Sequence, residues 1–221
     1  DAATRSDTVI NLSTALIGDD PYAAAHEIET QYRANVSVEA LLLGYLGPAA
    51  RQLGEWWESD EITFADVTVG TGRIYAIMRM LNRLLPAPTI PEHKAALVAS
   101  VPGETHVLGA RMATDLLRDN GWAIDLEMGH SHEEVIELIA RTRHLVVGLS
   151  AAGEHALPAL ARLVLAIQVR FPRVAIFVGG NIVAEAKEQI ALMRIDAMSQ
   201  NFAEASTQMD ALWDSVTVRD V

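Results

Sequence analysis

The spacing of apolar residues divides the chain into two halves of different kinds. In the first half, up to residue 85, apolar side chains recur every three to four positions, as in amphipathic helices. We expect helices at residues 8–17, 22–34, 37–57 and 67–85. Short connections favour antiparallel neighbours, so this half predicts a four-helix bundle. Three prolines within residues 86–91 forbid a continuous helix and mark a linker at residues 86–93.

Several of these helices begin with residues that are typical of helix starts. Asp20 followed by Pro21 predicts an N-cap with proline in the first turn, and Ser37 opens the third helix. Thr63 and Asp66 have the spacing of a capping box, with Asp where Glu is usual.

After the linker, short apolar runs alternate with helical patterns. Strands are expected near residues 94–101, 122–127, 144–149, 173–178 and 194–198, and a last helix at 202–213. This alternation predicts an α/β fold with a doubly wound, five-stranded parallel sheet of the Rossmann-like or flavodoxin-like type. The expected organisation is therefore a helical bundle at residues 1–85, the linker, and a sheet domain at residues 94–221.

Candidate chemistry gathers in three loops that follow strands. Residues 104–109 (ETHVLG) place His106 after the first expected strand, where open α/β sheets bind their ligands. Ser150 and Ala152 follow the third strand, and Gly179 and Gly180 follow the fourth. Because parallel strands end at one edge of a sheet, these loops are expected to converge there. Small residues at that edge leave room for a bulky ligand close to the backbone.

The three loops, with their spacing, resemble the cobalamin-binding domain of corrinoid methyltransferases, mutases and sensors. In that family the histidine coordinates cobalt from below, and the acid hydrogen-bonds its other nitrogen. The resemblance therefore implies His106 as the metal ligand and Glu104 as its partner, with Val107 and Gly109 in the same loop. The chemistry agrees, since imidazole is a common metal ligand and a neighbouring carboxylate fixes its tautomer and raises its basicity.

The resemblance also assigns the other two loops. The serine loop and the glycine pair would wall a groove for the nucleotide tail of the cofactor, which involves Ser150, Gly179 and Gly180. Ala152 departs from the leucine that is usual in the family, which shortens one wall of that groove. His155, shortly after Ser150, is expected to line the edge of the tetrapyrrole.

The first half resembles the helical cap of methyltransferase-type cobalamin modules, which covers the upper face of the corrin. The run at residues 53–58 (LGEWWE) is similar to the cap's Gly-x-x-Trp motif, so Trp56 or Trp57 is expected to face the cofactor. Adenosylcobalamin photoreceptors carry Glu-His further along the cap. Here Asp66 is followed by Val67, so the second histidine is missing.

The segment at residues 64–73 (FADVTVGTGR) instead resembles the antirepressors that control photosynthesis genes in purple bacteria, and related sensors that hold heme. Those relatives are regulators rather than catalysts. Arg73 at the end of this segment is expected to meet a propionate or amide side chain of a macrocycle, with a salt bridge inside the bundle as the alternative. The spacing of His130 and His132 would suit two metal ligands, but their loop is predicted to be a surface turn.

Charge and composition narrow the functional classes. A formal net charge of −12 in 221 residues argues against direct binding of nucleic acid, which needs clustered Lys and Arg. The chain has no cysteine, which excludes disulfides and a thiol nucleophile. It has no apolar run of membrane-spanning length and no signal-like start, so we expect a cytoplasmic protein without a membrane partner. Since it begins at Asp1 rather than Met, we expect a module of something larger.

Taken together, the sequence favours a cobalamin-binding sensory or regulatory module that responds to light or to a ligand. Its cofactor would be adenosyl-, methyl- or hydroxocobalamin, held by His106 below and by the helical cap above. One alternative is a sensor of the same architecture that binds heme or biliverdin, and another is a corrinoid carrier of a methyltransferase system. A non-catalytic role is favoured, acting through a protein partner or a fused output domain, and a homo-oligomer is left open.

Overall fold

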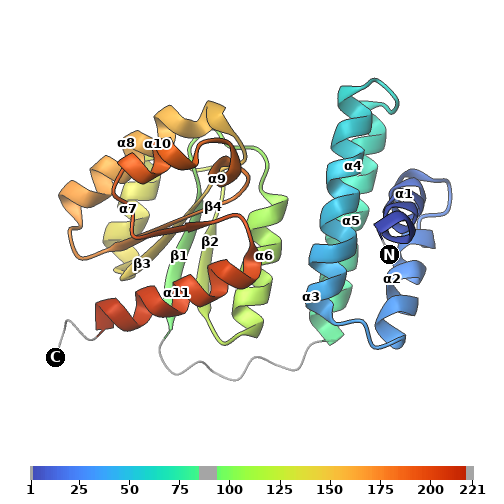
Figure 1. Ribbon diagram of the computed structural model, residues 1–221, viewed down its shortest axis with the longest axis horizontal. Coiled ribbons are helices and arrows are strands. Elements are labelled where there is room, and N and C mark those ends of the chain that lie inside the picture. The colour runs from blue at the N-terminus through green and yellow to red at the C-terminus, as the bar shows by residue number, and fades with distance from the viewer. Residues whose placement is uncertain (1, 85–93, 218–221) are drawn as a thin grey trace. The chain divides into compact units, whose positions relative to one another are not determined.

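The computed structural model in Figure 1 describes residues 2–84 and 94–217. Contacts divide the chain into two units, Asp1–Ala87 and Pro88–Val221, which we call the helical unit and the sheet unit. The linker expected at residues 86–93 lies outside the described residues.

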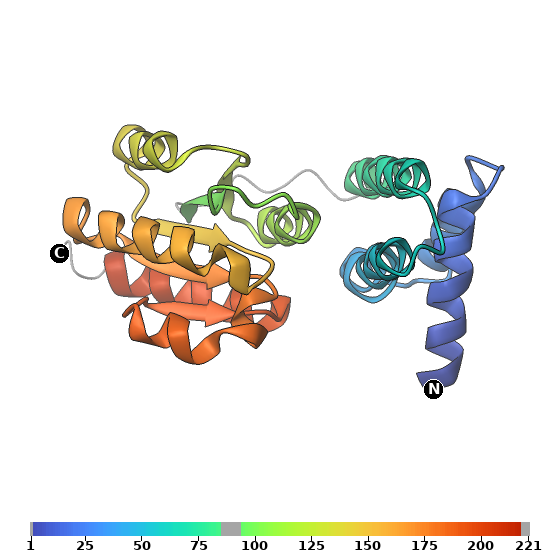
Figure 2. The ribbon, with the colours of Figure 1, turned by 90° about the horizontal axis from the view of Figure 1, so that it is seen from above.

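The helical unit consists of α1 (Ala2–Ile17), α2 (Ala23–Arg33), α3 (Val38–Leu41), a π-helical turn η1 (Leu42–Leu46), α4 (Gly47–Glu58) and α5 (Phe64–Leu84). The elements α3, η1 and α4 follow one another without a break, as expected for one long helix. Pro48 has no N–H to donate, so regular helical bonding cannot continue through its turn, which accounts for the π-helical turn just before it. Figure 2 shows α1 lengthwise while α4 and α5 are seen end-on, so α1 lies across that pair.

Two of the expected helix starts are confirmed and one is wrong. The backbone N–H of Ala40 donates to Ser37 Oγ at 3.1 Å. Thr63 N donates to Asp66 Oδ2 at 2.8 Å and Asp66 N donates to Thr63 Oγ1 at 3.2 Å, which completes a capping box. Asp20 does not cap α2, because its carboxylate accepts from Tyr22 N at 2.9 Å and so forms a turn before the helix begins at Ala23.

The sheet unit confirms the α/β prediction. Its strands are β1 (Ala95–Ser100), β2 (Ala123–Glu127), β3 (Val146–Ser150), β4 (Ala175–Gly179) and β5 (Ala197–Ser199), all parallel, in the order β2-β1-β3-β4-β5. Its helices are α6 (Leu108–Asp119), α7 (His132–Thr142), a 3-10 turn η2 (Glu154–Ala156), α8 (Leu157–Arg170), α9 (Ile182–Glu185), α10 (Lys187–Leu192) and α11 (Phe202–Thr217). The strand order reverses between β1 and β3, which is where doubly wound sheets bind ligands.

The central strands hold the sheet unit together. In β3 the residues Val146 and Val147 are fully buried, and Val147 packs in a core cluster with Val135 of α7 and Leu160 of α8. Burying each such side chain contributes about 1.5–3 kcal/mol. The strand register pairs Ser100 with Ser150 and Ser150 with Gly179, so the ends of β1, β3 and β4 are level.

None of the helices in the described ranges has both the length and the apolar character that crossing a bilayer requires.

Candidate functional site

The loops after β1, β3 and β4 meet at the carboxyl edge of the sheet. Val101 N donates to the carbonyl oxygen of Ser150 at 2.9 Å, and Ala151 N donates to that of Gly179 at 3.1 Å. Ladder-type bonding thus continues one residue beyond the strands and ties the three loops together. The structure brings together the loops that sequence reasoning selected.

His106 is exposed, and its ring is held from one side by Glu104. The side chain of His106 is 74% exposed, whereas that of Glu104 is 0% exposed. Glu104 Oε1 accepts from His106 N at 2.8 Å and lies 3.0 Å from His106 Nδ1. A carboxylate accepts only, so Nδ1 carries a proton, and in the neutral ring Nε2 keeps its lone pair. Nε2 is therefore the atom that could bind a metal, in an orientation that the buried acid fixes.

The same carboxylate also reaches the loop after β3. Glu104 Oε2 accepts from Ala152 N at 2.7 Å, and it lies 3.9 Å from Nε2 of His155, whose side chain is 62% exposed. Glu104 thus links two loops and has an imidazole near each oxygen. Sequence reasoning assigned Glu104 to His106 alone, and nothing local in the sequence signals a bond to a residue 48 positions away.

These bonds decide the ionisation of Glu104. Burial raises the pKa of its carboxyl group, but the N–H groups of His106 and Ala152, with the His106 ring, outweigh the burial. The pKa therefore lies below its ordinary value of 4.5. Glu104 is ionised at neutral pH, and its negative charge strengthens the hydrogen bond that it accepts from Nδ1 of His106.

Glu104→Gln should destabilise the sheet unit by about 1–3 kcal/mol at pH 7, because an amide cannot accept at both positions and leaves buried N–H groups unpaired. A carboxylate whose pKa is lowered in the folded state stabilises the fold fully above its unfolded-state pKa, and this contribution is lost as the pH falls through the folded-state pKa. The difference in free energy of unfolding between Glu104→Gln and wild type should therefore become smaller below about pH 4.5. Hydrogen-exchange protection of β1 and β3 amides in the full chain measures this free-energy difference.

Glu188→Gln is the control for this prediction, since Glu188 is exposed on α10 and should show no difference at either pH. A Glu104→Gln difference that is the same at pH 7 and pH 4 would contradict the assigned ionisation.

The glycines at this edge differ in whether the structure leaves room for a side chain. Gly180 has φ +108°, and a Cβ added to it would collide with the carbonyl oxygen of Ala151. A Cβ on Gly179 would lie 3.1 Å from Cε1 of Phe177. A Cβ on Gly109, in the first turn of α6, would meet nothing within 4 Å. Gly180 is therefore required by the packing of two loops, whereas Gly109 leaves the space beside the His106 loop open. Val107 lies between His106 and Gly109 in the chain and is partly buried just before α6.

In the helical unit, Trp56 and Trp57 differ in exposure. Trp57 is 47% exposed and its ring centroid lies 6.2 Å from that of Phe64, which is 69% exposed. Trp56 is partly buried, and its carbonyl oxygen accepts from Glu61 N at 2.8 Å, which closes the turn after α4. Of the two, Trp57 is the more exposed ring.

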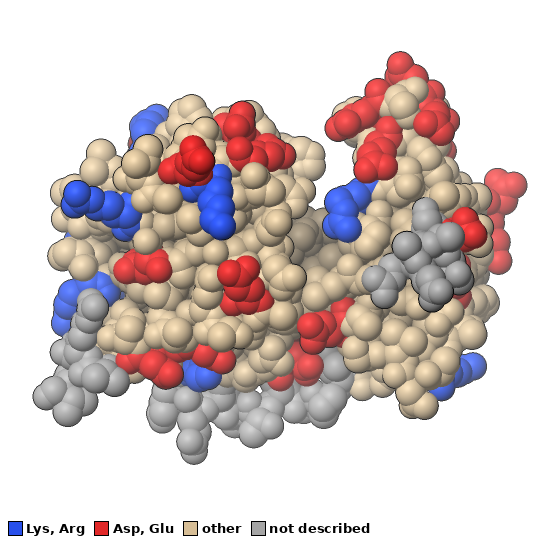
Figure 3. Space-filling view, in the orientation of Figure 1, with Lys and Arg blue, Asp and Glu red and all other residues tan. Residues whose placement is uncertain are grey.

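Acidic residues surround this aromatic pair. Figure 3 shows acidic side chains gathered over the connection between α4 and α5, where Glu55, Glu58, Asp60, Glu61 and Asp66 lie. Asp66 accepts from the hydroxyl of Thr63 at 2.7 Å and from its N–H, and these bonds lower the pKa of Asp66. The local role of Asp66 in the structure is to cap α5.

Arg73 is held inside the helical unit, by a contact that sequence reasoning missed. Its Nη1 donates to the carbonyl oxygens of Leu16 at 3.0 Å and Gly18 at 2.7 Å. The last carbonyls of a helix lack partners within the helix, so Arg73 satisfies the end of α1. The alternative of a salt bridge is replaced by this bonding to backbone oxygens.

Of the two histidines after β2, His130 pairs with acids. His130 Nε2 lies 2.9 Å from Glu127 Oε2. Across residues 2–84 and 94–217, no group of three or more His, Asp or Glu side chains is placed to hold a metal ion.

A family model and one relative match this chain. The family model of the B12 binding domain matches residues 94–208. A 20.5 kDa protein in the bchF-crtJ intergenic region of Rhodobacter capsulatus is 28% identical over 173 residues, which cover 77% of this chain and 90% of that protein.

Two solved structures share the fold over nearly their full length. The Methanosarcina barkeri monomethylamine corrinoid protein has a TM-score of 0.74 at 18% identity, covering 92% of this chain and 97% of that one. A cobalamin-binding protein from Desulfitobacterium hafniense has a TM-score of 0.50 at 17% identity, covering 92% and 98%. The likeness to the first extends the match to the helices that precede the sheet.

The residues present fit a corrin. An exposed imidazole whose Nδ1 is fixed can give its Nε2 to a cobalt ion, and the open space beside Gly109 puts no side chain in the way. This site and the family match, which spans more than half of the sequence, lead to one conclusion. The chain belongs to the B12-binding domain family, and its cofactor is cobalamin.

Proposed function

We propose that this chain is a sensory and regulatory module in which His106 is the lower axial ligand of cobalt and the helical unit covers the upper face of the corrin. The observation that carries the proposal is the His106 ring, exposed on one side and fixed by buried Glu104 on the other. A ligand that is held in place before binding loses little freedom when it binds.

Bound cobalamin supplies a cobalt ion whose upper ligand can be exchanged or released. The residues of this chain convert that change into a signal. Trp57 and Phe64 offer an exposed aromatic surface in the helical unit, and a different upper ligand would favour a different contact with it. The output passes to a protein partner or to a fused domain, as in other switches that act through a local change in packing.

A second function is favoured by a specific observation, the full-length fold likeness to a monomethylamine corrinoid protein. A corrinoid carrier would present its cofactor to a separate methyltransferase, so its helical unit would have to leave the upper face open. A sensor would keep that face closed. Closure over the cofactor therefore separates the two functions.

Reconstitution tests the proposal. The full chain is mixed in turn with hydroxo-, methyl- and adenosylcobalamin, heme and biliverdin, and absorption is recorded in darkness and after illumination. We expect cobalamins to bind in preference to heme and biliverdin, and hydrogen exchange of α4 and α5 to slow when an alkylcobalamin binds and to change again after light. Unchanged exchange in all states would favour the carrier, and preferred binding of heme or biliverdin would overturn the cobalamin sensor.

Trp57→Ala should remove the light-dependent exchange difference in α4 and α5, because the exposed ring is the one available to stack on the upper ligand. Trp56→Ala is the matched control and should keep that difference. If neither substitution changes the exchange difference, the proposed contact between this aromatic surface and the upper ligand is wrong.

A further inference from the structure

Helix α8 carries an exposed stripe that its own fold does not use. Pro158, Arg162, Leu165 and Val169 are all exposed, and Leu165 and Val169 are 62% and 73% exposed. Their alternating spacing of four, three and four residues places them on one face of the helix. The opposite face of α8 packs into the core with Leu160, Leu163, Val164 and Ile167. The stripe is therefore not needed to hold the sheet unit together.

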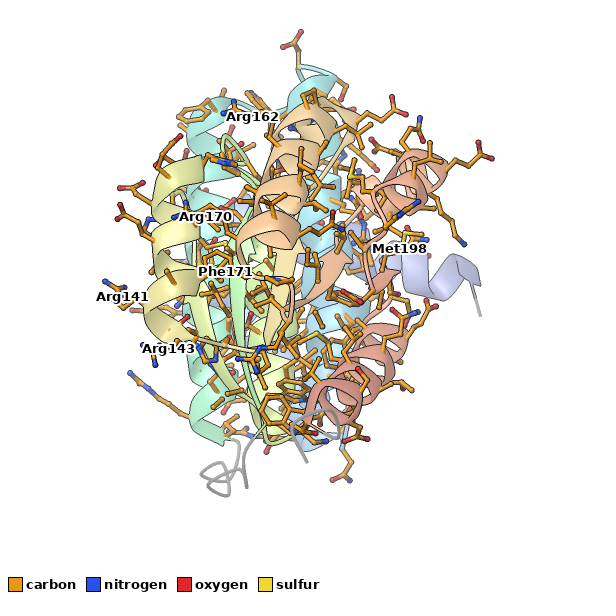
Figure 4. All side chains as sticks on the ribbon, turned by 90° about the vertical axis from the view of Figure 1, so that its left-hand side faces the viewer. Arg141, Arg143, Arg162, Arg170, Phe171 and Met198 are labelled. Atoms are coloured by element: carbon orange, nitrogen blue, oxygen red, sulfur yellow. The ribbon has the colours of Figure 1, made fainter. Side chains whose placement is uncertain are left out.

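Arginines frame this stripe. Between residues 138 and 184 the sequence has five arginines and a single acid, Glu154, although the whole chain has a net charge of −12. Arg141 and Arg143 lie at the end of α7, which packs beside α8, and Arg162 and Arg170 lie on α8 itself. Figure 4 looks onto these two helices and labels all four. Within the described ranges, none of the four forms an ion pair.

We propose that the α8 face, which we define as the stripe with Arg141, Arg143 and Arg170, docks an acidic amphipathic helix of a partner protein. Leu165 and Val169 lie one turn apart, so an apolar ridge of a second helix can pack between them. Carboxylates on the flanks of that helix would meet guanidinium groups, which bind them in a bidentate manner. Charge complementarity sets the orientation and speeds association.

Other occupants fit less well. A second copy of this chain, docked through the same face, would place arginines against arginines. Nucleic acid would meet two exposed aliphatic side chains at the centre of the face and a chain that is strongly acidic elsewhere. An acidic helix with an apolar seam matches both the charge and the aliphatic centre.

The α8 face also lies on the helix that leaves the cofactor loop. α8 begins at Leu157, directly after the turn that contains His155, and Glu104 bonds to Ala152 in the same loop. Docking does not depend on the proposed sensory role. If that role is correct, the partner would sit on a helix that leaves one of the loops of the site.

The test uses the full chain and a synthetic helical peptide with a leucine seam flanked by glutamates. Its binding is measured by fluorescence anisotropy and mapped by backbone amide shifts in NMR. We expect binding with shifts confined to α7 and α8. Arg162→Glu combined with Arg170→Glu should weaken binding at least about tenfold, because two attractions become repulsions. Leu165→Asp should do the same, and Leu192→Asp, at an 83% exposed leucine on α10, should change nothing.

Three comparisons make this test decisive. A peptide with the same leucine seam but lysines in place of glutamates should bind more weakly, and equal affinity would overturn the proposal. If a DNA duplex binds more tightly than the acidic peptide and shifts the amides of α7 and α8, the face belongs to nucleic acid. If the chain dimerises with increasing concentration and Arg162→Glu abolishes the dimer, the face belongs to a second copy. Circular dichroism of each variant checks the fold, which the outward direction of these side chains should preserve.

Discussion

His106→Ala should remove imidazole from the cobalt of bound hydroxocobalamin. Its absorption spectrum should shift to the form without imidazole coordination, and the affinity for hydroxocobalamin should fall at least about tenfold. Mutation of a residue that only hydrogen-bonds to a metal ligand already costs about tenfold in metal affinity, and loss of the ligand itself should cost no less. The structure gives the reason, because His106 offers an exposed Nε2 while Nδ1 is held by Glu104 at 3.0 Å. Spectral titration of the variant against wild type measures both effects.

His155→Ala is the matched control for that result. His155 also faces the carboxylate of Glu104, with its Nε2 3.9 Å from Oε2, but it lies in the loop after β3. This variant should keep the imidazole-coordinated spectrum. If His155→Ala loses it and His106→Ala keeps it, the two histidines have exchanged roles and our assignment is wrong.

Gly180→Ala should destabilise the sheet unit by about 1–3 kcal/mol or more, because L residues are strained in this backbone region and overpacking adds to the strain. Gly180 has φ +108° and its added Cβ would collide with the carbonyl oxygen of Ala151. To relieve that collision, the loops after β3 and β4 must separate, so cobalamin binding should weaken as well. Hydrogen exchange of β4 amides and a cobalamin titration measure the two effects.

Gly109→Ala provides the contrast. Its added Cβ would meet nothing within 4 Å, and alanine is favoured over glycine in a helix by up to about 1 kcal/mol. Stability should therefore stay the same or rise. A loss of stability in Gly109→Ala equal to that in Gly180→Ala would contradict the difference in packing between the two positions.

The sheet unit could be predicted from sequence because its strands are short apolar runs between helical patterns. Each expected strand is present, and the three that end at Ser150, Gly179 and Ser199 extend one residue beyond their expected ranges. That extension comes from pairing, since Ser150 and Gly179 are partners in the register of β3 and β4. Side-chain hydropathy does not report backbone bonding of this kind.

The candidate site was only partly predictable. The pairing of Glu104 with His106 is local, and the resemblance of their loop to the cobalamin-binding family implied it. The bond from Ala152 to Glu104 and the capping of α1 by Arg73 join residues far apart in the chain, and no periodicity encodes such contacts. Sequence reasoning also placed Asp20 as the cap of α2, but a turn formed by its own side chain competes with that role.

Electron paramagnetic resonance of the cob(II)alamin complex reports whether His106 binds cobalt. Protein labelled with ¹⁵N only in histidine is loaded with unlabelled cofactor. Axial coordination by a ¹⁵N nucleus splits each cobalt line into a doublet, whereas ¹⁴N gives a triplet. If His106 is the axial ligand, the wild-type chain gives a doublet that is lost in His106→Ala. A triplet in the labelled wild-type complex would show that the cofactor's own base, and not His106, coordinates the metal.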